Sequence, residues 1–223
     1  KIQKDNPSGM FDLFDKSSEY SLPEENDEAL VLHTSGTTSR PKIVPLTNKN
    51  IFSSAVNISK SLELCTADHC LNIMPLFHIH GLIAILAASM KVGASVCASN
   101  GFNAIKFLEL AKSEKITWYS GVPTMHQAIL LRAEKNLKLS KDLKLKFIRS
   151  SSASLPPAVF ENLKSVFKCP VIEAYGMTEA THQMTSNPLP PKVQKPGFVG
   201  ISAGPDVCIM DDSNKILNQG ETG

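Results

Sequence analysis

The chain has 223 residues, of which 42% are hydrophobic and 20% are charged, and its formal net charge at pH 7 is +2. This composition is typical of a globular protein with one large domain or two small ones. A net charge so close to zero gives no electrostatic reason to expect binding to nucleic acid or to an anionic membrane.

The cysteines and the chain ends indicate the compartment and the extent of the sequence. The five cysteines are odd in number and form no C-x-x-C pair, which argues against a disulfide framework or a zinc site and favours a reducing compartment. The most apolar window, residues 73–92, is interrupted by Pro75, His78, His80 and Lys91, so we expect no membrane span. The first residues resemble neither a signal peptide nor a transit peptide. Because both ends look cut, we expect part of a longer protein.

Apolar runs alternate with segments of helical periodicity along the chain. The first run, residues 29–32, reads as a buried strand, and later runs predict strands at 70–74, 94–97, 116–119, 147–148 and 171–174. Helical spacing and capping residues predict helices over about 48–64 and 80–91, and after Asn103, Pro123 and Pro156. Beyond Pro188 the alternation stops, and residues 207–210 and 215–217 indicate antiparallel strands.

This order of elements predicts the fold class. Strand–helix alternation is typical of a parallel sheet covered by helices, so we expect an α/β fold, with a mostly parallel sheet flanked by helices and followed by the start of an antiparallel β segment. In such sheets ligands bind beyond the carboxyl ends of the strands. Loops rich in polar residues follow five predicted strands, at residues 34–42, 75–81, 120–123, 150–154 and 175–179. We therefore expect one ligand site at that edge.

The loop after the first predicted strand has the composition of a phosphate site. It offers hydroxyl groups, backbone N–H groups and two cations, Arg40 and Lys42. The common P-loop pattern is absent, because no second glycine precedes Lys42. A plain flexible loop is the alternative at this point. The candidate phosphate-binding residues are Thr34, Ser35, Gly36, Thr37, Thr38 and Lys42.

Two further segments suit a nucleotide. Tyr175–Glu179 combines an aromatic ring, a glycine, a hydroxyl and a carboxylate, and so could stack a base, contact a phosphate and hold Mg²⁺ through Glu179. A glutamate after a strand is otherwise a helix-start or surface charge. The small residues Ser151–Ser154 could lie beside a planar ring, or could cap the following helix, and both roles are compatible.

His78 and His80 follow the second predicted strand. Their spacing suits a metal on a strand, but no cysteine or carboxylate cluster accompanies them, so satisfied core histidines are the favoured alternative. Trp118 is expected in the core.

Together these motifs resemble the acyl-adenylate-forming family, which includes acyl-CoA synthetases, the adenylation domains of peptide synthetases and firefly luciferase. The resemblance is carried by five ordered motifs, namely Thr34–Lys42, Pro75–His78, Gly121–Thr124, Ser151–Leu155 and Tyr175–Glu179. The amino-acid sequences of His33–Lys42 and of Met177–Pro188 look most similar to those of the oxalyl-CoA synthetases.

The resemblance implies a role for each matching residue. Thr34, Ser35, Gly36, Thr37, Thr38 and Lys42 would surround the ATP phosphates. Thr178 would touch the α-phosphate, Glu179 would hold Mg²⁺ and His78 would gate the carboxylate, so that Lys42, Thr178, Glu179 and His78 are the expected catalytic residues. The adenine pocket would be formed by Ser152, Ala153, Ser154, Glu173, Ala174, Tyr175 and Gly176. The acyl pocket would lie near His78, His80, Ser154 and His182, whose polarity suits a short dicarboxylate.

The implied reaction joins a carboxylic acid to coenzyme A, with ATP, Mg²⁺ and coenzyme A as cofactors. Oxalate or another short carboxylate is the expected substrate, and a medium-chain fatty acid, an aromatic acid or a non-catalytic nucleotide-binding module are the alternatives. Residues 1–187 would belong to the adenylation domain and 188–223 would begin its β subdomain. A C-terminal domain with the catalytic lysine would lie beyond Gly223. The expected compartment is cytoplasmic or peroxisomal, and the sequence gives no oligomeric state.

Overall fold

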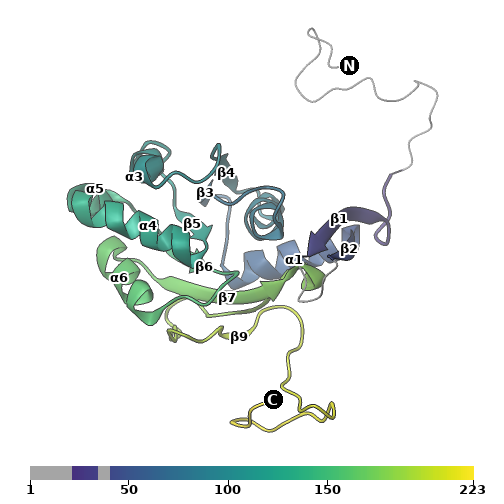
Figure 1. Cartoon of the computed structure of the whole chain (residues 1–223). Coiled ribbons are helices and arrows are strands. Elements are labelled where there is room, and N and C mark those ends of the chain that lie inside the picture. Colours follow the sequence, from purple (N-terminus) through teal and green to yellow (C-terminus); the bar gives the residue numbers. More distant parts are fainter. Residues whose placement is uncertain (1–21, 35–40) are drawn as a thin grey trace, which may run out of the picture.

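Two sheets carry the fold in the computed structural model, which describes residues 22–34 and 41–223 (Figure 1). A two-stranded antiparallel hairpin is formed by β1 (Glu28–Thr34) and β2 (Lys42–Thr47). The larger sheet has seven strands in the order β4-β3-β5-β6-β7-β8-β9. Its parallel part consists of β3 (His69–Asn72), β4 (Ser95–Ala98), β5 (Trp118–Gly121), β6 (Phe147–Ser150) and β7 (Val171–Met177). The antiparallel strands are β8 (His182–Ser186) and β9 (Ile201–Ser202).

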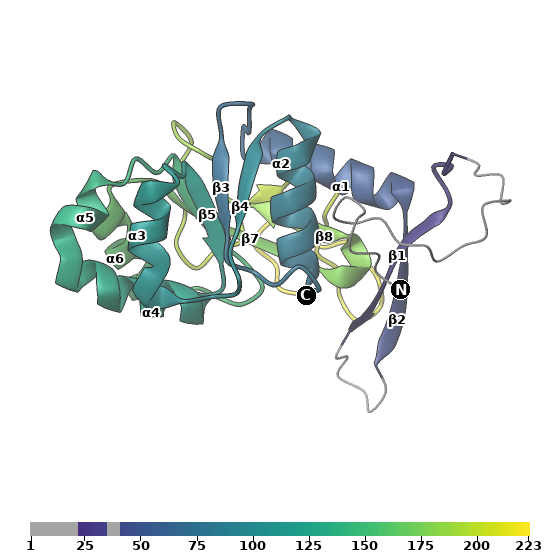
Figure 2. The ribbon, with the colours of Figure 1, turned by 90° about the horizontal axis from the view of Figure 1, so that it is seen from above.

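Helices cover both faces of the large sheet (Figure 2). One face is covered by α1 (Asn48–Ser61), the π-helix η1 (His80–Ala87) and α2 (Ala88–Lys91). The other is covered by α3 (Ala104–Ser113), α4 (Pro123–Ala133), α5 (Leu137–Asp142) and α6 (Pro157–Phe167). Two short 3₁₀-helices, η2 (Glu134–Asn136) and η3 (Thr178–Ala180), complete the set described.

The core follows from the alternation of side chains along the parallel strands. Tyr119 and Ile148 belong to the hydrophobic cluster beneath α3–α6, while their neighbours Trp118 and Phe147 belong to the cluster beneath α1, η1 and α2. All four side chains are fully buried, as expected for a parallel sheet with helices on both faces. The predicted α/β fold class and the core position of Trp118 are therefore confirmed.

The prediction for residues 29–32 was wrong in two respects. These residues do form a strand, β1, but most of its side chains are exposed and it pairs only with β2, outside the parallel sheet. The buried residues of the hairpin come from β2, which contributes Val44 and Leu46 to the core. A short apolar run has the same composition in a hairpin as in a buried strand, so periodicity could not separate the two.

Two helices begin at the predicted residues, and a side chain caps the first turn of each. Thr47 and Asn50 form a capping box at the start of α1, with Asn50 N donating to Thr47 Oγ1 over 3.2 Å. Asn103 Oδ1 accepts from the backbone N–H groups of Ile105 and Lys106 at the start of α3. The serines 151–154 do not cap α6, whose N-cap is Pro156 without a side-chain hydrogen bond. That capping alternative is wrong.

The chain beyond β7 also differs from the prediction. Residues 182–186 form β8, where no strand was predicted, and β9 adds a short antiparallel edge. In place of two strands, residues 207–217 contain a single antiparallel bridge between Met210 and Ile216. This segment extends away from the large sheet (Figure 1). The predicted antiparallel start is therefore present, but it is carried mainly by β8 and β9.

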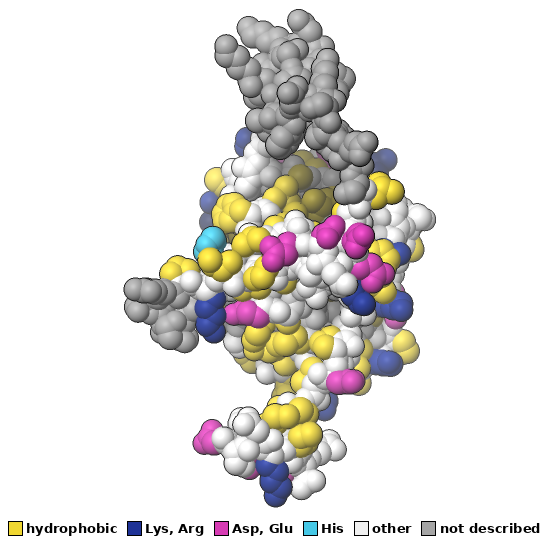
Figure 3. Space-filling view, turned by 90° about the vertical axis from the view of Figure 1, so that its right-hand side faces the viewer, with side chains coloured by type: hydrophobic (Ala, Val, Ile, Leu, Met, Phe, Trp, Pro, Cys, Tyr) yellow, Lys and Arg dark blue, Asp and Glu magenta, His cyan; other side chains and the backbone are white. Residues whose placement is uncertain are grey.

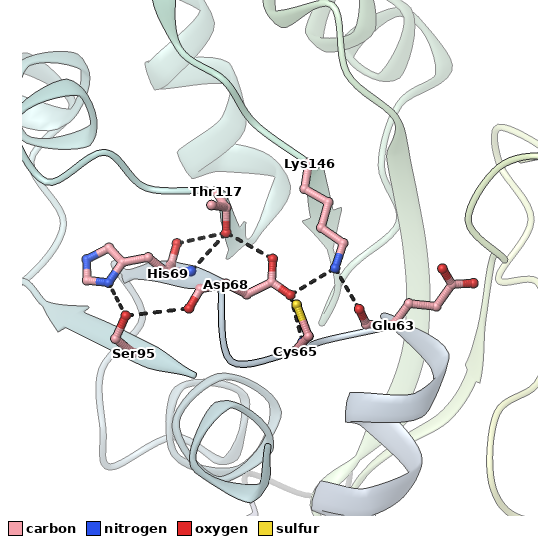
Figure 4. A network of polar contacts seen from close by, with 7 residues as sticks. All are labelled: Glu63, Cys65, Asp68, His69, Ser95, Thr117 and Lys146. Carbon is pink, nitrogen blue, oxygen red and sulfur yellow. Dashed lines mark hydrogen bonds and ion pairs between the residues drawn. The ribbon is translucent and has the colours of Figure 1, made fainter. Parts of the chain in front are cut away.

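A hydrogen-bonded network, which we call the Asp68 network, lies at the amino end of the parallel strands (Figure 4). Asp68 accepts from Lys146 Nζ over 2.8 Å, from Thr117 Oγ1 over 3.2 Å and from Cys65 N over 2.9 Å. Thr117 Oγ1 in turn accepts from His69 N. Asp68 is buried, and its charge is balanced by Lys146. The network ties the starts of β3, β5 and β6 together.

Charges of both signs are mixed on the face of the molecule that carries the hairpin (Figure 3). Seen from the hairpin side, acidic and basic side chains occur beside one another with hydrophobic side chains between them (Figure 3). Over residues 22–34 and 41–223, no helix combines the length and hydrophobicity needed to cross a bilayer.

Candidate active site

Buried polar side chains gather at the carboxyl end of the parallel strands. His80 begins η1 just after β3, Ser120 lies in β5 and Arg149 lies in β6, and each is 0% exposed. His80 Nε2 lies 2.6 Å from Ser120 Oγ, and His80 Nδ1 lies 3.1 Å from the hydroxyl of Ser152, which follows β6. These residues form one group with Arg149, His182 and Gln183, whose contacts are described below. We call this group the His80 cluster: His80, Ser120, Arg149, Ser152, His182 and Gln183.

The position of His80 depends on its neighbours in the chain. A side chain at Gly81 would place its Cβ 2.5 Å from the carbonyl oxygen of Pro75, so only glycine lets η1 begin so close to the preceding turn. His80 N donates to His78 Nδ1 over 3.1 Å. The His78 side chain is exposed at the edge of the site, and its partial burial lowers the pKa of the imidazole.

Arg149 provides a buried positive charge. Its Nη1 donates to Ser120 Oγ over 3.2 Å and its Nη2 donates to Gln183 Oε1 over 3.1 Å. Among the residues described, no carboxylate forms an ion pair with this guanidinium, and its Nε has no hydrogen-bond partner. Burial lowers the pKa of Arg149 to about 9, so the group remains charged at neutral pH.

His182 enters the cluster from the reversal between β7 and β8. The backbone there is strained, because Thr181 and His182 have φ angles of 54° and 91°. The ring centroid of His182 lies 5.0 Å from that of His80, and its buried Nδ1 has no partner among the residues described. Burial lowers the pKa of both histidines, and the charge of Arg149 lowers both further, so both rings are neutral.

Residues 175–177 are strand residues rather than a free loop. Strand β7 continues to Met177 and pairs with β8, which corrects the expectation that a loop begins at Tyr175. A Cβ at Gly176 would lie 1.5 Å from the carbonyl oxygen of His182, so the close approach that this glycine allows is to β8. Thr178 and Glu179 follow in η3, and the side chains of Tyr175 and Glu179 are exposed.

The predicted adenine-pocket residues lie on two adjacent segments. Ser151 Oγ donates to the carbonyl of Ala174 over 2.9 Å and joins them. The next residues, Ser152, Ala153 and Ser154, are exposed, whereas Glu173 and Ala174 are buried. The Glu173 carboxylate accepts from the backbone N–H of Gly197 over 2.9 Å, and burial raises its pKa.

The predicted phosphate loop belongs to the hairpin. Lys42 is the exposed first residue of β2 and pairs with Thr34, while Ser35, Gly36, Thr37, Thr38 and Arg40 lie outside the described residues. The expectation that this loop follows a strand of the parallel sheet is wrong, because it connects β1 to β2. Helix α1 packs against both the hairpin and β8, and Figure 2 shows the hairpin on the same side of the molecule as β8, away from α3–α6.

Three members of the His80 cluster were not singled out from the sequence. Arg149 had the clearest signal, since it follows the apolar residues of a strand that helices cover on both faces, and a charge there needs polar partners. Ser120 and Gln183 are common polar residues without a pattern of their own. Only the fold brings them to Arg149.

The described residues could hold a magnesium ion only together with a bound nucleotide and water. They contain no group of three or more His, Cys, Asp or Glu side chains able to enclose a metal. Mg²⁺ in nucleotide sites needs no such cage, because one or two carboxylates, substrate phosphates and water complete its coordination. The exposed carboxylate of Glu179 suits that arrangement.

Known proteins of similar sequence include carboxylate–CoA ligases. The chain is 46% identical over 201 residues to the oxalate–CoA ligase of Arabidopsis thaliana and covers 39% of it, using 89% of its own length. It is 44% identical over 198 residues to the oxalate–CoA ligase of Saccharomyces cerevisiae, covering 36% of that protein and 89% of this chain. The chain thus spans well under half the length of these relatives.

Solved structures agree with the sequence comparisons. ATP-bound MatB from Rhodopseudomonas palustris superposes with a TM-score of 0.78 at 28% identity, over 89% of this chain and 39% of MatB. A malonyl-CoA ligase with methylmalonyl-CoA and AMP bound gives a TM-score of 0.73 at 30% identity, over 80% of this chain and 38% of the ligase. The sequence also matches the profile of the AMP-binding enzymes over residues 3–223, and the chain belongs to that family.

Proposed function

We propose that this chain is the central part of an ATP-dependent carboxylate–CoA ligase that works through an acyl-adenylate, and that its acid is oxalate or another short carboxylate. Residues 1–187 would form part of the adenylation domain, 188–223 would begin its β subdomain, and the lysine-bearing domain would lie outside this chain. The observation that carries the substrate class is the polarity of the His80 cluster. A buried cation and two neutral histidines offer hydrogen bonds and positive potential, and an alkyl chain would gain little there.

The first step would be attack of the substrate carboxylate on the α-phosphate of ATP. A carboxylate is already a nucleophile, so this step needs positioning and charge neutralisation rather than a general base. Lys42 would neutralise charge on the leaving pyrophosphate, the hydroxyls between β1 and β2 would donate hydrogen bonds to it, and Thr178 would contact the α-phosphate. Glu179 would hold Mg²⁺, which supplies further positive charge to the phosphates when bound.

The second step would transfer the acyl group to coenzyme A. The thiol sulfur attacks the acyl carbonyl carbon and loses its proton to water, and AMP leaves with the electrons of the mixed anhydride bond. His78, exposed beside His80, would gate access to that carbon. The exposed segment 152–154 and Tyr175 would border the adenine, with Glu173 and Ala174 behind them.

Pyrophosphate release by the full-length protein tests this function. Oxalate, longer dicarboxylates, medium-chain acids and aromatic acids would each be supplied with ATP, Mg²⁺ and coenzyme A. We expect the fastest turnover with oxalate or another short carboxylate. Absence of turnover with every acid, together with retained ATP binding, would instead favour a non-catalytic nucleotide-binding module.

Two substitutions test the assigned roles. Lys42→Ala and Glu179→Ala should each lower the rate by about 100-fold or more, the usual cost of removing a group that stabilises developing charge. Lys49→Ala is the matched control, because Lys49 is an exposed lysine on α1 whose only ion pair is with exposed Glu25 among the residues described. Unchanged rates in both test variants would reject the roles given to Lys42 and Glu179.

A further inference from the structure

The protonation state of His80 follows from the hydrogen bonds around it. Arg149 Nη1 lies 3.2 Å from Ser120 Oγ and 3.3 Å from His80 Nε2, and a guanidinium can only donate. Ser120 Oγ therefore accepts from Arg149, and its own hydrogen points along the 2.6 Å contact to His80 Nε2. If Nε2 carried a proton instead, it would face the N–H of Arg149, and the hydrogen of the buried Ser120 hydroxyl would have no acceptor among the residues described.

The other ring nitrogen must then carry the proton. Since His80 is neutral and Nε2 accepts, Nδ1 is protonated and donates to Ser152 Oγ over 3.1 Å. The hydrogen of the Ser152 hydroxyl remains, and it has no acceptor among the residues described. The hydrogen bonds therefore run in one direction, from Arg149 through Ser120 and His80 to Ser152.

Ser152 is the point where this chain of hydrogen bonds reaches the surface. Its side chain is exposed, whereas the three groups behind it are fully buried. Its φ angle of 72° is uncommon for a residue with a side chain, and such strain is often found at ligand sites. A buried cation at the far end of the chain strengthens the Ser152 O–H as a donor, because successive hydrogen bonds polarise one another.

We propose that Arg149 is a positioning residue that fixes His80 in its Nδ1-protonated form, so that Ser152 presents its hydroxyl hydrogen to an anionic oxygen of the bound substrate. This inference rests on the proposed function and adds a specific ligand group to it. The oxygen belongs to the carboxylic acid or to a phosphate of ATP, and the two share the same chemistry at Ser152. Arg149 itself acts through His80 and does not touch the substrate.

The tautomer can be measured without any activity. In full-length protein labelled with ¹⁵N-histidine, the His80 signals would be assigned by their loss in His80→Asn. We expect a protonated Nδ1 and an unprotonated Nε2 in the wild type, and loss of this preference in Arg149→Met. A protonated Nε2 in the wild type would overturn the proposal, whether or not the protein is a ligase.

Steady-state kinetics test the consequence at Ser152. Arg149→Met and Ser152→Ala should each raise one KM by roughly 10- to 100-fold, the range for a hydrogen bond to a charged group. A rise in the KM of the acid identifies a carboxylate oxygen as the acceptor, and a rise in the KM of ATP identifies a phosphate oxygen. An unchanged KM for both substrates would overturn the proposal.

A double variant separates the relay from independent effects. Because Arg149 acts through Ser152, the Arg149→Met/Ser152→Ala protein should be no more impaired than Ser152→Ala alone. Multiplying effects would overturn the relay. Arg132→Met, at an exposed arginine of α4, is the matched control and should leave both KM values unchanged. If Arg149→Met does not fold, Ser120→Ala interrupts the same chain of hydrogen bonds and carries the same expectations.

Discussion

The two ends of the parallel sheet hold polar networks that differ in one respect. At the amino end, the carboxylate of Asp68 is balanced by Lys146 and by two further donors. At the carboxyl end, three residues further along the chain from Lys146, Arg149 is completely buried and has no acidic partner among the described residues. A satisfied network needs nothing more, whereas a buried cation whose hydrogen-bond chain ends at the exposed Ser152 favours an anion that arrives there from outside. We infer that the Asp68 network serves stability and that the His80 cluster serves binding.

The largest expected effect on stability is at Asp68. Asp68→Ala removes three hydrogen bonds at about 1 kcal/mol each, so the free energy of unfolding should fall by about 3 kcal/mol. Urea unfolding of the full-length protein would measure the loss, and amide exchange at the starts of β3 and β6 would localise it. The control is Asp142→Ala, which breaks an exposed pair with Lys112 and should cost at most about 1 kcal/mol. Equal losses in the two variants would remove the distinction between the networks.

A smaller effect on stability is expected at Arg149. Arg149→Met loses two hydrogen bonds at about 1 kcal/mol each, but it also removes the desolvation cost of a buried cation that has no acidic partner among the described residues, so the free energy of unfolding should change by no more than about 1 kcal/mol in either direction. Lys146→Met is the comparison, because it strips the buried Asp68 of its cation and should destabilise clearly. The same unfolding experiment decides. If Arg149→Met were as damaging as Asp68→Ala, Arg149 would be a structural residue.

The smallest expected effect is the pH dependence of the stability that Asp68 contributes at the amino end of the sheet. Burial alone would raise the pKa of Asp68, but the hydrogen bonds from Lys146 and from Cys65 N outweigh it and hold the pKa below its usual value. A depressed carboxylate pKa adds stability above pH about 4, and that stability is lost as the pH falls further. The stability difference between wild type and Asp68→Asn should therefore shrink below pH about 4. A difference that stays constant down to pH 2 would contradict the assigned role of Asp68.

The sequence predicted the layered part of the fold because strong periodicity and turn residues mark it. The alternation of strands and helices from Cys70 to Ala174 is clear, and the buried positions on both faces follow from it. The hairpin was not predicted, because neither the exposed side chains of β1 nor the short apolar sequence of β2 indicates which strand each one pairs with. Strand β8 was also not predicted, because its sequence does not reveal its burial. Its residues, His182–Ser186, are mostly polar, yet nearly all are buried by tertiary contacts.

The site was predictable only where a motif is continuous in the chain. Lys42, Glu179, His80 and His182 lie in recognisable segments, and the structure brings His80 and His182 together. The contacts of Arg149 join residues from four separate elements, and no local pattern encodes them. A charge within a covered strand was the one available clue.

The separate hairpin has a consequence for how this fold tolerates insertions and deletions. Since β1 and β2 bond to each other and not to the large sheet, one residue added to each strand would lengthen their ribbon by about 3.4 Å and leave the register of the large sheet untouched. The same addition would turn every side chain beyond it to the opposite side of the ribbon. Lengthening the hairpin would thus change both the length of the β1–β2 ribbon and the side of the ribbon on which the added and following strand side chains lie.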